Sequence, residues 1–167
     1  IMVRIGGIEI PTPLSLAPMA GVTDIAFRTI CREQGAGLTC TEMVSAKAVS
    51  FGDQKTFSLA RILPDEGPVS VQIFGSEPEV MANAAYTLSN APDGIRPVAI
   101  DINMGCPVHK IFSNGEGSAL MRDPDLIYRI TKAVSGAIDI PTTVKIRAGI
   151  NSQSINAVEC ARAAEEG

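Results

Sequence analysis

The sequence is poor in the residues that bind metals or cross-link a fold. Only four of its 167 residues are cysteines, no two of them form a C-x-x-C pair, and His109 is the one histidine. This composition argues against a zinc site, so we expect no metal. A chain of this length with so few cysteines also does not depend on disulfides. Reduced cysteines are typical of a cytoplasmic protein, which is the location we expect.

Long apolar runs and an excess of positive charge are also missing. No stretch approaches the roughly 20 apolar residues that a membrane-spanning helix needs, and the first residues show no signal-peptide pattern. The net charge of −4 gives no overall indication of nucleic-acid binding, although it leaves room for a local basic patch. A hydrophobic content of 46% over this length indicates one domain with a sizeable core.

Short apolar segments alternate along the chain with amphipathic ones. The predicted strands cover residues 14–17, 37–44, 69–74, 98–103 and 142–147. The predicted helices cover residues 23–35, 77–90, 123–137 and 151–167, and residues 45–68 form a long loop with a short helix near FSLARI. Thr23 is the expected N-cap of the first helix, and Gly35 its end. Five strand–helix units in series indicate a parallel sheet.

Polar side chains on the predicted strands distinguish two forms of parallel sheet. Each of the last three strands has an aliphatic face and an opposite polar face, the polar residues including Gln72, Asp101, Asn103, Lys145 and Arg147. An open, doubly wound sheet would be apolar on both faces, and no G-x-G-x-x-G motif follows the first strand. Polar side chains near the strand ends are typical of a barrel active site. We therefore predict an α/β fold, a parallel (β/α)8 TIM barrel, of which this chain carries about the first five βα units.

The segment AIDINMGCPVHK, residues 99–110, carries an acid, an amide and a thiol at the end of one predicted strand. Cys106 lies in a glycine-proline turn and is the candidate for chemistry, whereas the other three cysteines are interpreted as small buried apolar residues. His109 could act as the base for Cys106 as a nucleophile, but no third residue is evident to orient it.

Four stretches together resemble the tRNA-dihydrouridine synthases, FMN-dependent enzymes with a barrel followed by a small helical domain. They are LAPMAGVTDIAFR (16–28), VQIFGSEPE (71–79), DINMGCPVHKIFSNGEGSALMRDP (101–124) and VKIRAG (144–149). The N-x-G-C-P segment followed by GEGSAL is highly specific. The dihydroorotate and dihydropyrimidine dehydrogenases, which act on free pyrimidines, are the nearest alternatives, but the GSALM continuation favours the tRNA enzymes.

The resemblance implies reduction of the C5–C6 double bond of uridine in tRNA. In that reaction NADPH reduces FMN, hydride passes to C6, and Cys106 protonates C5. A cysteine thiol in water is mostly protonated at neutral pH, so it can serve as an acid. The expected partner is tRNA, and no membrane is implied.

The resemblance also assigns residues to the flavin. Pro18, Met19 and Ala20 would contact its ring through backbone and packing, and Gln72 would hydrogen-bond its pyrimidine edge. Lys145 would lie near N1 and O2, where a fixed cation favours the anionic reduced flavin.

Asn103 and Arg147 would hold the target uracil, and Asp101 would anchor neighbouring loops. Residues 1–167 are then expected to be the N-terminal portion of an FMN-binding catalytic domain. The rest of the barrel and a C-terminal helical tRNA-binding domain would lie outside this chain, so alone it would bind FMN weakly and reduce no tRNA. A non-catalytic RNA-binding fragment is the remaining alternative.

Overall fold

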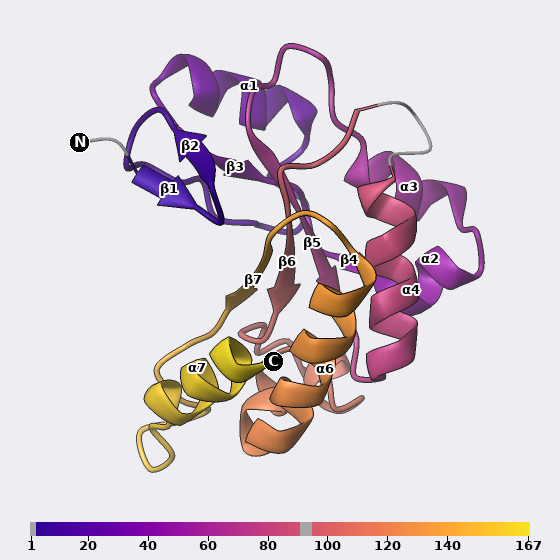
Figure 1. Cartoon of the computed structure of the whole chain (residues 1–167), viewed down its shortest axis with the longest axis vertical. Coiled ribbons are helices and arrows are strands. Elements are labelled where there is room, and N and C mark those ends of the chain that lie inside the picture. The colour runs from indigo at the N-terminus through magenta and orange to yellow at the C-terminus, as the bar shows by residue number, and fades with distance from the viewer. Residues whose placement is uncertain (1–2, 91–94) are drawn as a thin grey trace.

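Parallel strands form the central sheet of the computed structural model, which describes residues 3–90 and 95–167. In the middle of the sheet β5 (Val69–Phe74) pairs with β6 (Ala99–Asn103), which pairs in turn with β7 (Thr142–Lys145). On its other side β5 pairs first with β3 (Thr39–Cys40) and further along with β4 (Val44–Ser45). Figure 1 shows these strands side by side in chain order.

The first predicted strand, residues 14–17, appears only as a parallel bridge between Ser15 and Leu38. The N–H of Leu16 donates to the carbonyl of Leu38 at 2.9 Å, so this segment lies beside the chain that leads into β3. The predicted strand 37–44 is divided into β3 and β4 by a break. The parallel α/β sheet is therefore confirmed, whereas five complete βα units and a closed barrel stay predictions.

The helices α4 (Pro78–Ser89) and α6 (Pro124–Ala137) cover the aliphatic face of the sheet (Figure 1). Each begins with proline in its first turn, where the missing N–H costs nothing. The core formed between sheet and helices is almost fully shielded from water and includes Val71, Ile73, Ile100, Ile102, Met81, Ala85, Ile127 and Ile130. The aliphatic face predicted for each strand is thus the face that packs on helices.

The N-cap of helix α1 (Ile25–Glu33) lies one residue after the predicted Thr23. Asp24 is the cap, because its carboxylate accepts the N–H of Phe27 at 2.9 Å. Thr23 was the wrong residue for this role: its hydroxyl bonds the backbone of Met19 instead. Gly35 follows the helix with a φ of 100°, as its predicted role at the helix end requires.

Several elements depart from the sequence prediction. An antiparallel hairpin of β1 (Val3–Ile5) and β2 (Ile8–Ile10) precedes the sheet and was not predicted. The unpredicted short elements also include α2 (Ala46–Ser50), α5 (His109–Phe112) and a 3₁₀ helix at Gly117–Arg122. In contrast, α3 (Gln54–Ala60) overlaps the short helix predicted near FSLARI. The last helix, α7 (Ala157–Glu166), starts later than predicted, and β7 ends at Lys145, so Arg147 lies beyond it.

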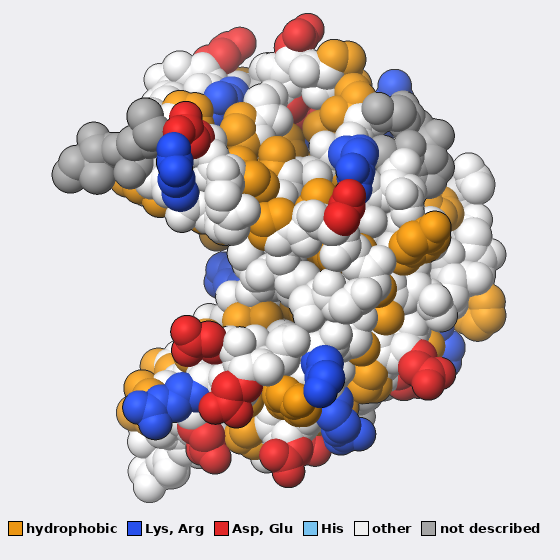
Figure 2. All heavy atoms as spheres, viewed as in Figure 1, with side chains coloured by type: hydrophobic (Ala, Val, Ile, Leu, Met, Phe, Trp, Pro, Cys, Tyr) orange, Lys and Arg blue, Asp and Glu red, His pale blue; other side chains and the backbone are white. Residues whose placement is uncertain are grey.

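Figure 2 shows the molecule hollowed between the hairpin β1–β2 and α7. Among the helices of residues 3–90 and 95–167, none combines the length and the apolar character needed to cross a membrane.

Candidate active site

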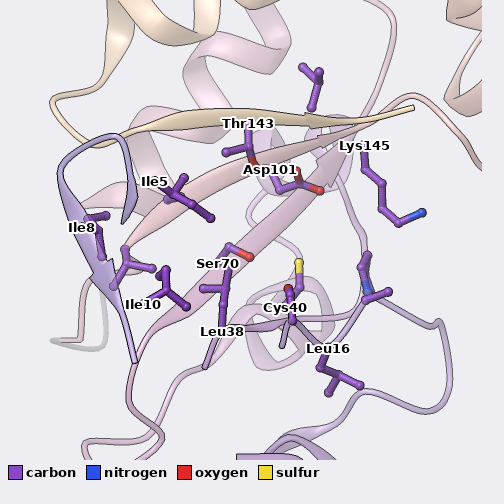
Figure 3. Close-up of a pocket in the computed structure, with 16 residues that line it drawn as sticks. Ile5, Ile8, Ile10, Leu16, Leu38, Cys40, Ser70, Asp101, Thr143 and Lys145 are labelled. Carbon is purple, nitrogen blue, oxygen red and sulfur yellow. Dashed lines mark hydrogen bonds between the residues drawn. The ribbon is translucent and has the colours of Figure 1, made fainter. Parts of the chain in front are cut away.

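An apolar cavity of about 360 Å³ lies between the hairpin and the amino-terminal halves of the strands (Figure 3). Ile5, Ile8 and Ile10 of the hairpin line one side of it, and Leu38 and Ser70 line another. The cavity faces the polar side of the sheet, opposite the face that packs on helices. The hairpin thus closes off the end of the sheet that is remote from the predicted chemistry.

A second cavity, of about 310 Å³, lies at the carboxyl ends of the strands. Its lining residues are Pro18, Ala20, Met43, Gln72, Asn103, Gly105, Cys106, Pro107, Val108 and Lys145. It therefore brings together every predicted site residue except Met19 and Arg147. Pro18 and Lys145 line both cavities, so the two are neighbours on the same face of the sheet.

Met19 and Arg147 lie outside this lining. Met19 is 40% exposed, and its backbone is used within its own turn: its N–H donates to Thr23 Oγ1, and its carbonyl accepts from the N–H groups of Val22 and Thr23. Only its side chain is therefore available to a ligand. Arg147 follows the end of β7 and is exposed.

Three polar side chains from neighbouring strands are joined across the sheet. Thr143 Oγ1 donates to Asp101 Oδ1 at 2.6 Å, and Gln72 Nε2 donates to Asp101 Oδ2 at 2.5 Å. The strand register explains these contacts, since Gln72 and Thr143 lie directly opposite Asp101 on its two sides. Asn103 then donates from Nδ2 to Gln72 Oε1 at 2.8 Å. A continuous hydrogen-bonded chain thus runs from β7 through β6 and β5 and back to the end of β6.

Asn103 connects this chain to the turn that carries the candidate acid. Its Oδ1 accepts the N–H of Gly105 at 3.1 Å and the N–H of Cys106 at 2.9 Å. The carbonyl of Cys106 accepts the N–H of Ser118 at 2.9 Å. The backbone of Cys106 is therefore held on both sides, while its half-buried side chain lines the cavity.

Burial and nearby charges change the pKa values of two ionisable groups near the sheet, Asp101 and Cys40. Desolvation raises the pKa of Asp101 above its ordinary 3.8, against the opposing effects of the hydrogen bonds from Thr143 and Gln72 and of the Lys145 charge. Burial, together with the nearby Asp101, raises the pKa of Cys40 from 9.0 to about 12. Cys40 is thus an inert thiol, as predicted for a small buried residue.

The turn that contains Pro18 and Ala20 is anchored by a buried ion pair. Arg28 is 1% exposed, and its Nε lies 2.8 Å from Glu66 Oε1. Its Nη1 also donates to the carbonyl of Thr23 at 2.9 Å, and the N–H of Gly21 donates to the carboxylate of Glu42. These contacts fix the turn against β3 and the loop that follows α3.

The structure adds residues that the sequence prediction missed. Thr143 could have been found, because it shares a strand face with Lys145 and lies beside Asp101. Met43 could not, since it lies in an unpredicted break between strands, yet its Sδ is 3.3 Å from Asn103 Nδ2. His109, the alternative base, is an exposed residue at the start of α5.

The cavity combines groups with complementary chemical abilities. A thiol can give up a proton, an ammonium can stabilise negative charge, and a primary amide can donate and accept hydrogen bonds. Within the described residues, Lys145 has no ion-pair partner, so its charge is available to a ligand. In the same part of the chain, no three His, Cys, Asp or Glu side chains are grouped so as to hold a metal ion.

Comparisons with known proteins place this chain in a family. The family model described as Dihydrouridine synthase (Dus) matches residues 15–167. The tRNA-dihydrouridine synthase B of Pseudomonas aeruginosa is 44% identical over 167 residues, which cover 99% of this chain and 48% of that protein. The proteins of the same name from Proteus vulgaris and Salmonella typhimurium are 46% and 43% identical, over 97% and 98% of this chain and 49% and 50% of theirs.

The chain spans about half the length of the curated relatives it matches. The family match nevertheless extends over all strands of the central sheet and over every residue that lines the second cavity, from Pro18 to Lys145. This chain therefore belongs to the dihydrouridine synthase family.

Proposed function

We propose that the protein to which this chain belongs reduces the C5–C6 double bond of uridine in tRNA to dihydrouridine. The observation that carries the proposal is the convergence of the Cys106 thiol, the Lys145 ammonium and the Gln72 amide on one cavity. The names of the relatives, tRNA-dihydrouridine synthase B, support tRNA as the substrate.

The donor set of the cavity fits FMN. Gln72 keeps one amide hydrogen beyond the one that it gives to Asp101, and this hydrogen suits a carbonyl or ring nitrogen at the pyrimidine edge of a flavin. Lys145 would lie beside N1 and O2, with Pro18, Met19 and Ala20 against the ring. When bound and reduced by NADPH, FMN supplies the hydride that C6 of the uracil receives.

Cys106 acts as the acid in this proposal. Its S–H bond breaks as a new C–H bond forms at C5, so that one hydride and one proton together saturate the double bond. The thiolate that remains takes a proton from solvent before the next turnover. Because the backbone of Cys106 is fixed at its N–H and its carbonyl, only rotation of the side chain is needed to aim the sulfur.

Asn103 and Arg147 are proposed to hold the uracil. Asn103 has one N–H on Gln72 and the other near the sulfur of Met43. Thioether sulfur is a weak acceptor, so a uracil carbonyl can take over this second N–H. Arg147 is exposed beyond β7 and does not line the cavity, so in this proposal its side chain would extend toward the bound uracil.

We also infer that residues 1–167 form the first part of a (β/α)8 barrel domain. The order of the strands in the sheet supports this inference, because the strands lie side by side in the order in which they follow one another in the sequence, as in a barrel. In the full-length protein the other half would complete the barrel, bind the FMN phosphate and carry a helical tRNA-binding domain. The 167-residue piece alone would then bind FMN weakly and leave tRNA unreduced.

The test uses the purified full-length protein. Its absorption spectrum should show bound flavin, and incubation with NADPH and unmodified tRNA should yield dihydrouridine, detected by mass spectrometry of the nucleosides. Reduction of free orotate or uracil in place of tRNA would move the assignment to the pyrimidine dehydrogenases. A protein with no flavin spectrum and no reductase activity would support a non-catalytic role and end the proposal.

A further inference from the structure

The chain of hydrogen bonds across the sheet has a single direction. A carboxylate oxygen accepts hydrogen bonds, and both oxygens of Asp101 receive one, from Thr143 and from Gln72. The Nε2 of Gln72 must face Asp101, so its Oε1 faces away, toward Asn103.

At the other end of this series of hydrogen bonds, the turn of Cys106 sets the same donor-to-acceptor direction independently. Gly105 and Cys106 each present a backbone N–H to Asn103, so the oxygen of that amide must face the turn. The Nδ2 of Asn103 is then free to donate to Gln72. It meets Gln72 Oε1, because Gln72 Nε2 donates to Asp101. The direction set by Asp101 and the direction set by the turn therefore agree at the bond between Asn103 and Gln72. Every donor in this series of hydrogen bonds points toward the carboxylate of Asp101.

We propose that Asp101 is a positioning residue, which fixes the turn of Cys106 by orienting the amides of Gln72 and Asn103. Asp101 lines the apolar cavity. It is not among the residues that line the second cavity, which contains Cys106. It therefore acts on the acid through two intervening side chains. The catalytic consequence rests on the proposed function, whereas the structural consequence does not.

An isosteric change separates orientation from packing. In Asp101→Asn the volume is kept, but the side chain gains a donor. Thr143 can accept it, because a hydroxyl both donates and accepts. In the molecules where the new donor faces Gln72, the amide of Gln72 must turn its oxygen toward position 101. In those molecules Gln72 Nε2 faces Asn103 Nδ2, so two donors meet. Asn103 then loses its acceptor at position 72, and its orientation depends on its bonds to the N–H groups of Gly105 and Cys106. In the double variant Asp101→Asn/Gln72→Glu the carboxylate moves to position 72, where it accepts from the new amide and from Asn103, so the direction is restored.

The first readout is hydrogen exchange in the full-length protein, measured at residue resolution by mass spectrometry. In Asp101→Asn we expect the amides of Gly105 and Cys106 to exchange about tenfold faster, as loss of one hydrogen bond implies. The amide of Met104 is the internal reference, because it donates to the backbone carbonyl of Lys145. The double variant should return both exchange rates to those of the wild type.

Ser70→Ala is the matched control, since Ser70 is a buried polar residue on the same strand and face as Gln72 but bonds Thr39. It should leave the exchange of Gly105 and Cys106 unchanged. Thr143→Val removes only the outermost donor and should give a smaller acceleration. This variant keeps the test available if Asp101→Asn does not fold.

The second readout is the single-turnover rate of uridine reduction by pre-reduced enzyme. Asp101→Asn should slow it at least tenfold, with little change in the KM for tRNA. Equal exchange rates in Asp101→Asn, Thr143→Val and wild type would overturn the proposal, and so would faster exchange with an unchanged single-turnover rate. If the wild type itself reduces no tRNA, the proposed function fails, and the exchange data still decide the structural role of Asp101.

Discussion

Gly117 lies directly against Cys106. Its φ is 61°, in the left-handed region, and a Cβ placed on it would come within 2.8 Å of the Cys106 carbonyl oxygen and 3.1 Å of the Cys106 Cβ. The next residue, Ser118, donates its N–H to the same carbonyl. The start of the GSALM segment is thus in contact with the reactive turn, which gives this part of the family motif a structural reason.

We predict that Gly117→Ala impairs activity beyond its effect on stability. The left-handed conformation alone costs an alanine about 1–2 kcal/mol, and the new methyl group pushes against Cys106. Gly115→Ala is the control, because Gly115 has a φ of 77° but nothing within 4 Å of its would-be Cβ. Denaturant unfolding should show a loss of stability in both variants, the larger one in Gly117→Ala because of the added contact, whereas uridine reduction by the folded protein should be slower only in Gly117→Ala. Equal rates in both would show that the contact with Cys106 is unimportant.

Replacing the acid should affect one half of the catalytic cycle. In full-length Cys106→Ala we expect flavin reduction by NADPH at the wild-type rate and uridine reduction slower by roughly 10²-fold or more. Stopped-flow absorbance measures the first step, and dihydrouridine formation measures the second. Cys31→Ala, at another half-buried cysteine, should leave both steps unchanged. Uridine reduction at the wild-type rate in Cys106→Ala would mean that another group is the acid.

The charge of Lys145 should stabilise the reduced flavin. We expect Lys145→Met to lower the flavin midpoint potential by about 30 mV, which corresponds to about 1.4 kcal/mol for two electrons. Lys132→Met removes the same charge on α6, where the ammonium bonds Tyr128, and should leave the potential unchanged. Spectroelectrochemical titration of the full-length proteins compares the three. A potential in Lys145→Met equal to that of the wild type would contradict a position of Lys145 near N1.

The Arg28–Glu66 pair should be costly to break from one side. Arg28→Met leaves the Glu66 carboxylate buried without its partner, which we expect to lower the free energy of unfolding by about 3–5 kcal/mol. Arg28→Met combined with Glu66→Gln removes the buried charge and should recover part of this loss. Urea denaturation gives the three values, and a double variant that is less stable than Arg28→Met would refute the explanation.

Cys40 should make stability depend on alkaline pH. Its pKa is near 9.0 in the unfolded chain and about 12 when folded, so only the unfolded chain ionises as the pH rises above 9.0. The contribution of the buried thiol is complete below that pH and falls by about 1.4 kcal/mol per pH unit toward 12. The stability difference between wild type and Cys40→Ala, followed by denaturant unfolding from pH 8 to 10.5, should therefore shrink. A constant difference would contradict the raised pKa.

The strands that carry the site could be predicted because their signals are local. In Val69–Phe74 the apolar Val69, Val71 and Ile73 alternate with the polar Ser70 and Gln72, and the predicted limits of this strand match β5. The alternation in residues 98–103 likewise predicted which side chains of β6 face the cavity. The convergence of Gln72, Asn103 and Lys145 followed from the rule that parallel strands end at one edge of a sheet.

Other features depend on tertiary contacts that no local pattern reports. The hairpin β1–β2 is too short to show a clear alternation, and it is located by the packing of Ile5, Ile8 and Ile10 over the apolar cavity. The break between β3 and β4 interrupts a run that reads as one strand. The hydrogen bond from Gln72 to Asp101 needed the register of two strands, which the sequence does not state.

The groups that connect the turn of Cys106 to the sheet all lie between Gln72 and Lys145. A nascent polypeptide therefore has every one of these partners once Lys145 has left the ribosome. The side-chain contacts join residues that are 29, 31 and 42 positions apart, and the entropic cost of closing such loops grows only slowly with their length. The pocket for the chemistry can thus take its shape early in synthesis and serve as a template on which later residues assemble.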